Sequence, residues 1–146
     1  MEMIVGQRRK LLGEVLESVT AWSRLLGSTR SAPFRGRKLS RSQLEALFLI
    51  AHRPPPVTPS SLARDLGLTA GAVTQLLDGL RHAGLVDQRP HPGDARSRVL
   101  TLTQDAGRQV SVYEDAAVAG LAGRFAGLDD AELATLSRLL ARTVPR

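Results

Sequence analysis

The chain has 146 residues, enough for one domain with a hydrophobic core, but only 3% are aromatic, so aliphatic side chains must fill that core. Lysine and arginine outnumber the acids 20 to 14, and the resulting net charge of +6 favours a polyanionic partner. The absence of cysteine excludes disulfides and thiol-based oxidant sensing. No apolar run approaches the ~20 residues of a membrane span and no signal peptide opens the chain, so we expect a cytoplasmic protein without a membrane partner.

The first predicted helix has apolar residues at helical spacing and should end near Gly27 or Ser28. A second helix should begin after Ser40, because Ser40 and Gln43 have the spacing of a capping box, and should continue through Ala51. The apolar face of the first helix consists of Leu11, Leu12, Val15, Leu16, Val19, Trp22, Leu25 and Leu26.

Residues 58–83 predict two short helices joined by a tight corner. Thr58 can cap the first helix, Pro59 suits its first turn, and Gly67 can end it in the left-handed conformation. Thr69 then caps the second helix at once. This arrangement is typical of a helix-turn-helix.

The second of these helices has an apolar face around Val73, which should turn toward the core. Its other faces carry Gly71, Thr74, Gln75 and Arg81. Glutamine can bond adenine bidentately, threonine can offer a methyl to thymine, and glycine lets the backbone approach a partner closely. Taken alone, the helix could equally be an ordinary polar surface helix, but its context favours DNA recognition.

The next segment predicts a β-hairpin. Strand-like residues 85–89 and 96–102 flank a Pro-His-Pro-Gly sequence at 90–93 that demands a turn. Asp94 lies two residues before an arginine and can hold its guanidinium in place. Arginines on a narrow ribbon can enter a minor groove or clamp phosphates; the hairpin carries Arg89, Arg96 and Arg98. Alone, it could be a solvated hairpin with an ordinary ion pair, but directly after a helix-turn-helix it predicts a wing.

Two further helices are predicted beyond Thr103. Asp129 and Glu132 form a capping box at the start of the last helix, which explains these acids better than acid–base chemistry does. The two apolar patterns run through Val110, Tyr113, Ala117, Leu121 and Phe125, and through Leu133, Leu136, Leu139 and Leu140. Spacing alone leaves open whether the terminal helices pack on their own monomer or on a partner.

His52, His82 and His91 are spaced in no metal-binding box. The sequence contains no catalytic constellation, so we expect no enzyme activity, no metal and no cofactor.

The run from Leu62 to Thr103 resembles the core of the MarR family of bacterial transcription regulators, including an Asp-x-Arg wing signature at Asp94 and Arg96. Chain length and flanking helices fit over nearly the whole sequence. The resemblance implies a mainly α fold with a small β-hairpin wing, a winged helix-turn-helix flanked by N- and C-terminal dimerisation helices. Ala95 departs from the family pattern, since many similar sequences have a second arginine at this position. Without that arginine, the wing should contact the minor groove more weakly or should contact it through Arg98.

The same resemblance implies one MarR-type domain over residues 1–146, with dimerisation helices at 1–38 and 104–146 and the DNA-binding part at 39–103. It implies a homodimer that represses from a pseudo-palindromic double-stranded DNA operator and is released by a small anionic or phenolic effector. The effector-binding residues stay unassigned. A winged-helix module that binds an acidic protein instead of DNA is the alternative from another class.

Two sets of residues carry these expectations. The predicted DNA contacts are Ser60, Ser61, Thr69, Ala70, Gly71, Thr74, Gln75, Arg81, Asp94, Arg96 and Arg98. The predicted dimer contacts are Leu11, Leu12, Val15, Val19, Leu133, Leu136 and Leu140.

Overall fold

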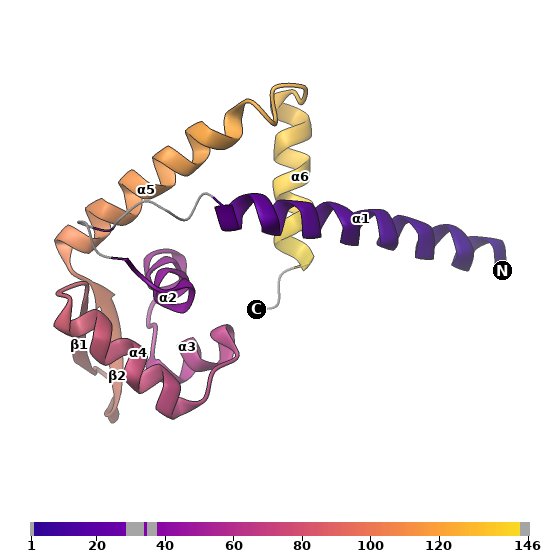
Figure 1. Ribbon diagram of the computed structural model, residues 1–146. Coiled ribbons are helices and arrows are strands. Elements are labelled where there is room, and N and C mark those ends of the chain that lie inside the picture. Colours follow the sequence, from indigo (N-terminus) through magenta and orange to yellow (C-terminus); the bar gives the residue numbers. More distant parts are fainter. Residues whose placement is uncertain (1, 29–33, 35–37, 144–146) are drawn as a thin grey trace. The chain divides into compact units, whose positions relative to one another are not determined.

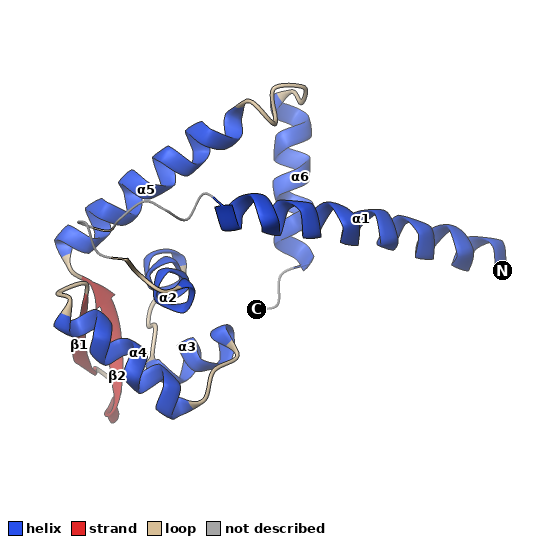
Figure 2. Ribbon diagram, in the orientation of Figure 1, coloured by secondary structure: helices blue, strands red, loops and turns tan. Residues whose placement is uncertain are grey.

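The computed structural model describes residues 2–28, 34 and 38–143, which form helices and one two-stranded antiparallel sheet (Figures 1 and 2). The chain divides into two compact units, Met1–Leu39 and Ser40–Arg146. None of the described helices is both long and apolar enough to cross a membrane.

The first unit contains helix α1, Glu2–Ser28, which ends where the sequence predicts. Its apolar face lies open: Leu11, Leu12, Val15, Leu16 and Val19 are 50% to 66% exposed. An apolar helix face of this kind normally packs against another element, so α1 has a surface suited to a partner.

The second unit opens with α2, Arg41–His52, whose predicted capping box is confirmed. The Gln43 N–H donates to Ser40 Oγ at 3.2 Å, and the Ser40 N–H donates to Gln43 Oε1 at 2.9 Å. The helix buries Ala46, Leu47 and Ile50. It therefore supplies one wall of the core.

The predicted helix-turn-helix is present as α3, Pro59–Leu66, and α4, Ala70–His82. Gly67 ends α3 in the left-handed conformation with φ 63°, and the Thr69 hydroxyl accepts the Ala72 N–H at the start of α4. Only two residues, Leu68 and Thr69, separate Gly67 from the first residue of α4, so the corner is tight. Leu62 of α3 and the inner face of α4 are buried together in the core.

The hairpin consists of β1, Val86–His91, and β2, Asp94–Leu102. The prediction that Pro90 and His91 lie in the turn is wrong, because Pro90 pairs with Arg98 and His91 with Asp94. Proline is tolerated there because each strand of a two-stranded ribbon has an unpaired edge. The turn is correspondingly short, and His91 Nδ1 accepts the Gly93 N–H at 3.0 Å.

One core unites these elements. Its largest fully buried side chains come from α2, α3 and α4, and the base of the hairpin and the start of α5 complete it. Its members include Ala46, Leu47, Ile50, Val57, Leu62, Val73, Leu77, Leu80, Leu85, Val86, Leu100, Ala106 and Val110. Because the hairpin base and α4 are buried in the same core, the positions of α4 and the hairpin are coupled.

Helix α5, Gln104–Ala122, has Thr103 as its N-cap and ends earlier than the predicted pattern through Phe125. Gly123 is its C-cap, and glycine has low helix propensity. Phe125 instead lies in a turn, where its carbonyl accepts the Leu128 N–H at 2.9 Å. Helix α6, Asp130–Thr143, follows, with the predicted capping box between Asp129 and Glu132 at 2.8 and 2.9 Å.

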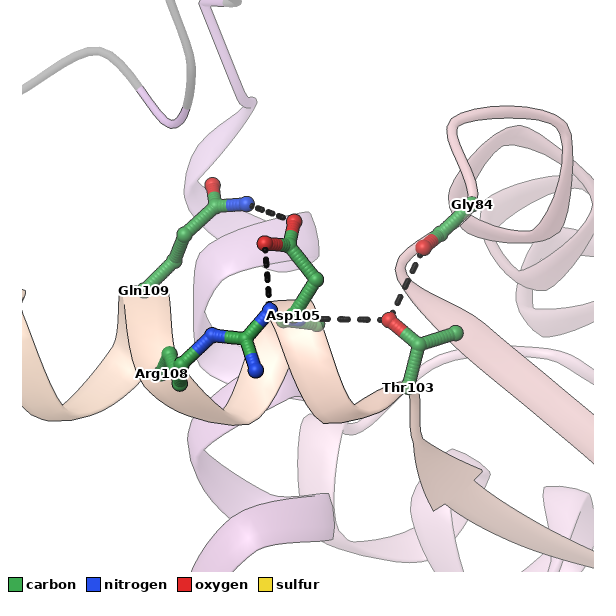
Figure 3. Close-up of polar contacts among 6 residues, drawn as sticks. Gly84, Thr103, Asp105, Arg108 and Gln109 are labelled. Carbon is green, nitrogen blue, oxygen red and sulfur yellow. Dashed lines mark hydrogen bonds and ion pairs between the residues drawn. The ribbon is translucent and has the colours of Figure 1, made fainter.

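Thr103 links α5 to the preceding elements (Figure 3). Its hydroxyl donates to the Gly84 carbonyl at 2.9 Å and accepts the Ala106 N–H at 3.2 Å. Its own N–H donates to the Leu85 carbonyl at 3.1 Å. One residue thus caps α5 and holds its first turn against the turn between α4 and β1.

Candidate nucleic-acid interface

Helix α4 has an inner and an outer face, as predicted. Val73, Leu77 and Leu80 are buried, whereas Gly71, Thr74 and the other predicted contacts on this helix are exposed: Ala70, Gln75 and Arg81. The buried face fixes the helix on the core, and the outer face is free to meet a partner. Exposure makes these side chains accessible to DNA, and their individual contacts with it stay predictions.

Two side chains on this outer face already have partners within α4. The Thr74 hydroxyl donates to the Ala70 carbonyl at 3.0 Å, and the Arg81 guanidinium lies 3.3 Å from Asp78 Oδ1. Both residues of the ion pair are about half exposed, so water and salt screen it and a phosphate can compete for the arginine.

The start of α3 differs from expectation at Ser61. Its hydroxyl accepts the Thr58 N–H at 3.0 Å and donates to the Thr58 carbonyl at 2.9 Å, while the Ser61 N–H donates to Thr58 Oγ1 at 3.1 Å. Serine replaces the usual Glu or Gln at the third position of a capping box, which is why the sequence motif did not reveal it. Ser61 is therefore committed to the cap, whereas Ser60 is exposed.

The corner between α2 and α3 is held by an ion pair. The Arg53 guanidinium, directly after α2, contacts the Asp65 carboxylate of α3. The side chains are only 28% and 15% exposed, so this pair is screened less than a surface pair. It holds the helix-turn-helix against α2.

The three arginines of the hairpin are all exposed, but they do not share one face. Arg89 lies opposite Val99, whereas Arg98 lies opposite Pro90. Side chains of directly paired residues lie on the same face, and neighbours along a strand alternate. Arg89 and Arg98 consequently project from opposite faces of the wing.

Asp94 has a different role from the one predicted. Its Oδ1 accepts the backbone N–H of Arg96 at 2.9 Å, and among the described side chains no ion pair joins it to the Arg96 guanidinium. An aspartate that bonds the N–H two residues on forms an Asx turn. Asp94 therefore shapes the backbone at the wing tip, and the Arg96 side chain stays exposed.

A pocket lies among the end of α2, strand β2 and α5, with a volume of about 560 Å³. Ile50, Val57 and Val110 contribute apolar walls, and His52 and Glu114 contribute polar groups. His52 Nε2 contacts the Glu114 carboxylate although 62 residues separate them in sequence. Beside this contact, the rings of Phe48 and Tyr113 lie 5.5 Å apart at 59°. No local motif marks such a pair.

Comparison with known proteins finds similarity to transcription regulators. The MarR family matches over residues 38–97. The HTH-type transcriptional repressor YetL of Bacillus subtilis is 36% identical over 49% of this chain and 44% of its own length. An HTH-type transcriptional regulator of Mycobacterium bovis is 31% identical over 64% of this chain and 65% of its own length. The chain thus spans about half to two thirds of these curated relatives.

A crystal structure of Streptococcus pneumoniae FabT in complex with DNA has the same fold, with a TM-score of 0.66 at 22% identity over 91% of this chain and 92% of that chain. Both curated relatives are named as transcriptional regulators, which agrees with the prediction of a non-enzymatic protein. Residues 38–97 of this chain thus match the MarR family, and the chain shares its fold with the FabT structure.

Proposed function

We propose that the protein is a sequence-specific DNA-binding regulator of transcription that acts as a repressor. One observation carries this proposal: the outer face of α4, with Thr74 and Gln75 exposed, is anchored through the same core as a wing that bears exposed arginines. Helix side chains can read base edges in a major groove, and the arginines can bind the adjacent backbone or minor groove. A relative named as a repressor and a similar fold solved with DNA support the assignment.

The proposed active form is a homodimer on a pseudo-palindromic operator. The exposed leucines and valines of α1 support it, as does Leu140 of α6, which is 51% exposed, whereas Leu133 and Leu136 are half-buried. Two recognition helices must lie about 34 to 36 Å apart to read successive major grooves. Since the partner would be operator DNA, we propose that the protein works in the cytoplasm.

We further propose that a small anionic or phenolic effector binds the pocket between α2, β2 and α5. Its volume of about 560 Å³ suits a small molecule, with apolar walls for a ring and with His52 as the polar group that an anionic ligand would meet. Bound there, a ligand would contact both α5 and the winged part. It would release DNA only if it bound the DNA-free arrangement more tightly than the DNA-bound one.

Calorimetric titration with benzoate and with phenol tests the pocket. We expect saturable binding that His52→Ala weakens several-fold, and we expect the bound probe to lower affinity for DNA. His82→Ala is the matched control, because His82 is exposed on α4 and outside the pocket lining. If the two variants bind benzoate and phenol equally well, the pocket is not the effector site.

The central experiment is an electrophoretic mobility shift of the protein on the intergenic DNA upstream of its own gene, titrated with salt and with unrelated duplex. Binding that resists competitor and protects two half-sites one helical turn apart would support the regulator. If a panel of genomic fragments yields no preferred duplex, the proposal fails. A winged-helix module for an acidic protein partner would then take its place.

A further inference from the structure

The Thr74 side chain presents restricted chemistry to a partner. A hydroxyl has one proton, and that of Thr74 is donated to the Ala70 carbonyl at 3.0 Å. While this bond persists, Thr74 cannot donate to guanine O6, a purine N7 or a phosphate. Two features of the side chain remain for a partner: its methyl group, and the hydroxyl oxygen as a hydrogen-bond acceptor.

Gly71 leaves room beside that methyl. It lies three residues before Thr74, so both are on the same face of α4. Helix side chains lean toward the N-terminus, so Thr74 leans over the turn that contains Gly71. A Cβ built on Gly71 has no neighbour within 4 Å, so packing within the described protein does not require a glycine there. A partner can approach both the backbone and the methyl group.

Gln75 complements this apolar contact. It is exposed and follows Thr74 directly, about 100° around the helix. Its amide has both a donor and an acceptor, which match N7 and N6 of adenine. Thymine is the base that carries a methyl in the major groove, and every thymine is paired with an adenine.

We propose that Thr74 reads thymine through its methyl group and that Gln75 reads an adenine in the same or the next base pair, so that the step under the start of α4 contains A·T pairs. This inference rests on the proposed DNA-binding function. It assigns Thr74 as a specificity-determining residue that acts through apolar contact and not by donating a hydrogen bond.

The test removes single methyl groups from the DNA. Duplexes selected by the full-length protein from a random pool would be resynthesised with deoxyuridine in place of each thymine in turn, and affinities measured by fluorescence anisotropy. At one thymine per half-site we expect a loss of about fourfold, the value of one buried methyl-sized group. The Thr74→Val protein, which keeps a methyl and lacks the hydroxyl, should show the same loss of affinity when that thymine is replaced with deoxyuridine.

Thr74→Ser is the decisive variant, because it keeps the hydroxyl and lacks the methyl. It should bind the thymine and deoxyuridine duplexes equally. Discrimination retained by Thr74→Ser, or lost in Thr74→Val, would overturn the assignment. Circular dichroism melts would show that both variants are folded, as expected for an exposed position.

The outcome also separates the two proposals. If no duplex is selected from the pool, DNA-binding regulation fails and the base assignment fails with it. If a duplex is selected but no thymine methyl contributes, only the role of Thr74 is overturned.

Discussion

At Gly71, helix stability and DNA binding place opposite demands on one residue. Glycine within a helix costs about 0.5 to 1 kcal/mol relative to alanine, and no neighbour within 4 Å of a Cβ compensates for it. We expect Gly71→Ala to raise the free energy of unfolding by up to about 1 kcal/mol, measured by urea denaturation. We expect the same variant to bind operator DNA more weakly, because the added methyl would lie between α4 and the bases.

Gly107→Ala is the matched control for this prediction. Gly107 lies in α5, and a Cβ there likewise has nothing within 4 Å. It should gain similar stability with unchanged DNA affinity. If Gly71→Ala also binds DNA normally, the close approach of α4 to the bases is excluded.

Arg96 and Gln75 should differ in the kind of contact they make. Arg96→Ala should weaken binding to all sequences and reduce the slope of log affinity against log salt by about one, because one phosphate contact is lost. Gln75→Ala should instead cost about 1 to 3 kcal/mol at one base step and leave the salt slope unchanged. Mobility shifts on wild-type and single-substituted operators measure both effects.

Arg124→Ala controls for net charge, since Arg124 is exposed between α5 and α6, away from the hairpin. It should change neither affinity nor salt slope appreciably. Identical behaviour of Arg96→Ala and Gln75→Ala on every duplex would contradict the separate roles.

Among the elements, the start of α5 depends on a single side chain (Figure 3). Thr103→Ala removes the cap acceptor for the Ala106 N–H and the donor to the Gly84 carbonyl. We expect a loss of about 1 to 2 kcal/mol in the free energy of unfolding, measured by thermal or chemical denaturation.

Thr103→Ser keeps the hydroxyl and should retain most of this stability. If serine and alanine destabilise equally, the methyl group and not the two hydrogen bonds holds the junction. Because the bond to Gly84 joins α5 to the turn after α4, Thr103→Ala should also loosen the coupling between α5 and the winged part.

The wing shows what an element's register decides. Three arginines in two adjacent strands look equivalent in the sequence, but pairing of Arg89 with Val99 and of Arg98 with Pro90 separates them onto two faces. A shift of one residue would exchange those faces. The sequence indicates that the hairpin is basic, and only the register indicates which arginines can meet one DNA backbone together.

For the whole molecule, the open apolar face of α1 is expected to be the dimer contact. Leu12→Lys would place a charge in that interface, so we expect the dimer dissociation constant to rise at least about tenfold, given the value of one buried leucine. Sedimentation velocity measures this change. Operator affinity should fall with it, since one recognition helix contacts only one half-site.

Glu17→Gln is the control for Leu12→Lys, because each raises the net charge by one and Glu17 lies on a different face of α1. The control should dimerise normally. A Leu12→Lys protein that stays dimeric would exclude this face as the interface.

Local signals predicted most elements of this protein. The caps at Ser40, Thr58 and Thr69 are confirmed, and so is the left-handed end at Gly67, because each depends on hydrogen bonds or dihedral angles within a few residues. The helical period of α4 separated its buried and exposed faces for the same reason. The error at Pro90 arose because turn propensity is local, whereas strand pairing depends on the partner strand.

The amino-acid order alone was enough to identify the helix-turn-helix, the basic hairpin and the α4 residues that face outward, since caps and periodicity are short-range properties. Tertiary structure was needed for the contact of His52 with Glu114, the bond of Thr103 to Gly84 and the opposite projection of Arg89 and Arg98. Each joins or orients residues on different elements. Their positions follow from how the whole core packs, which no local pattern records.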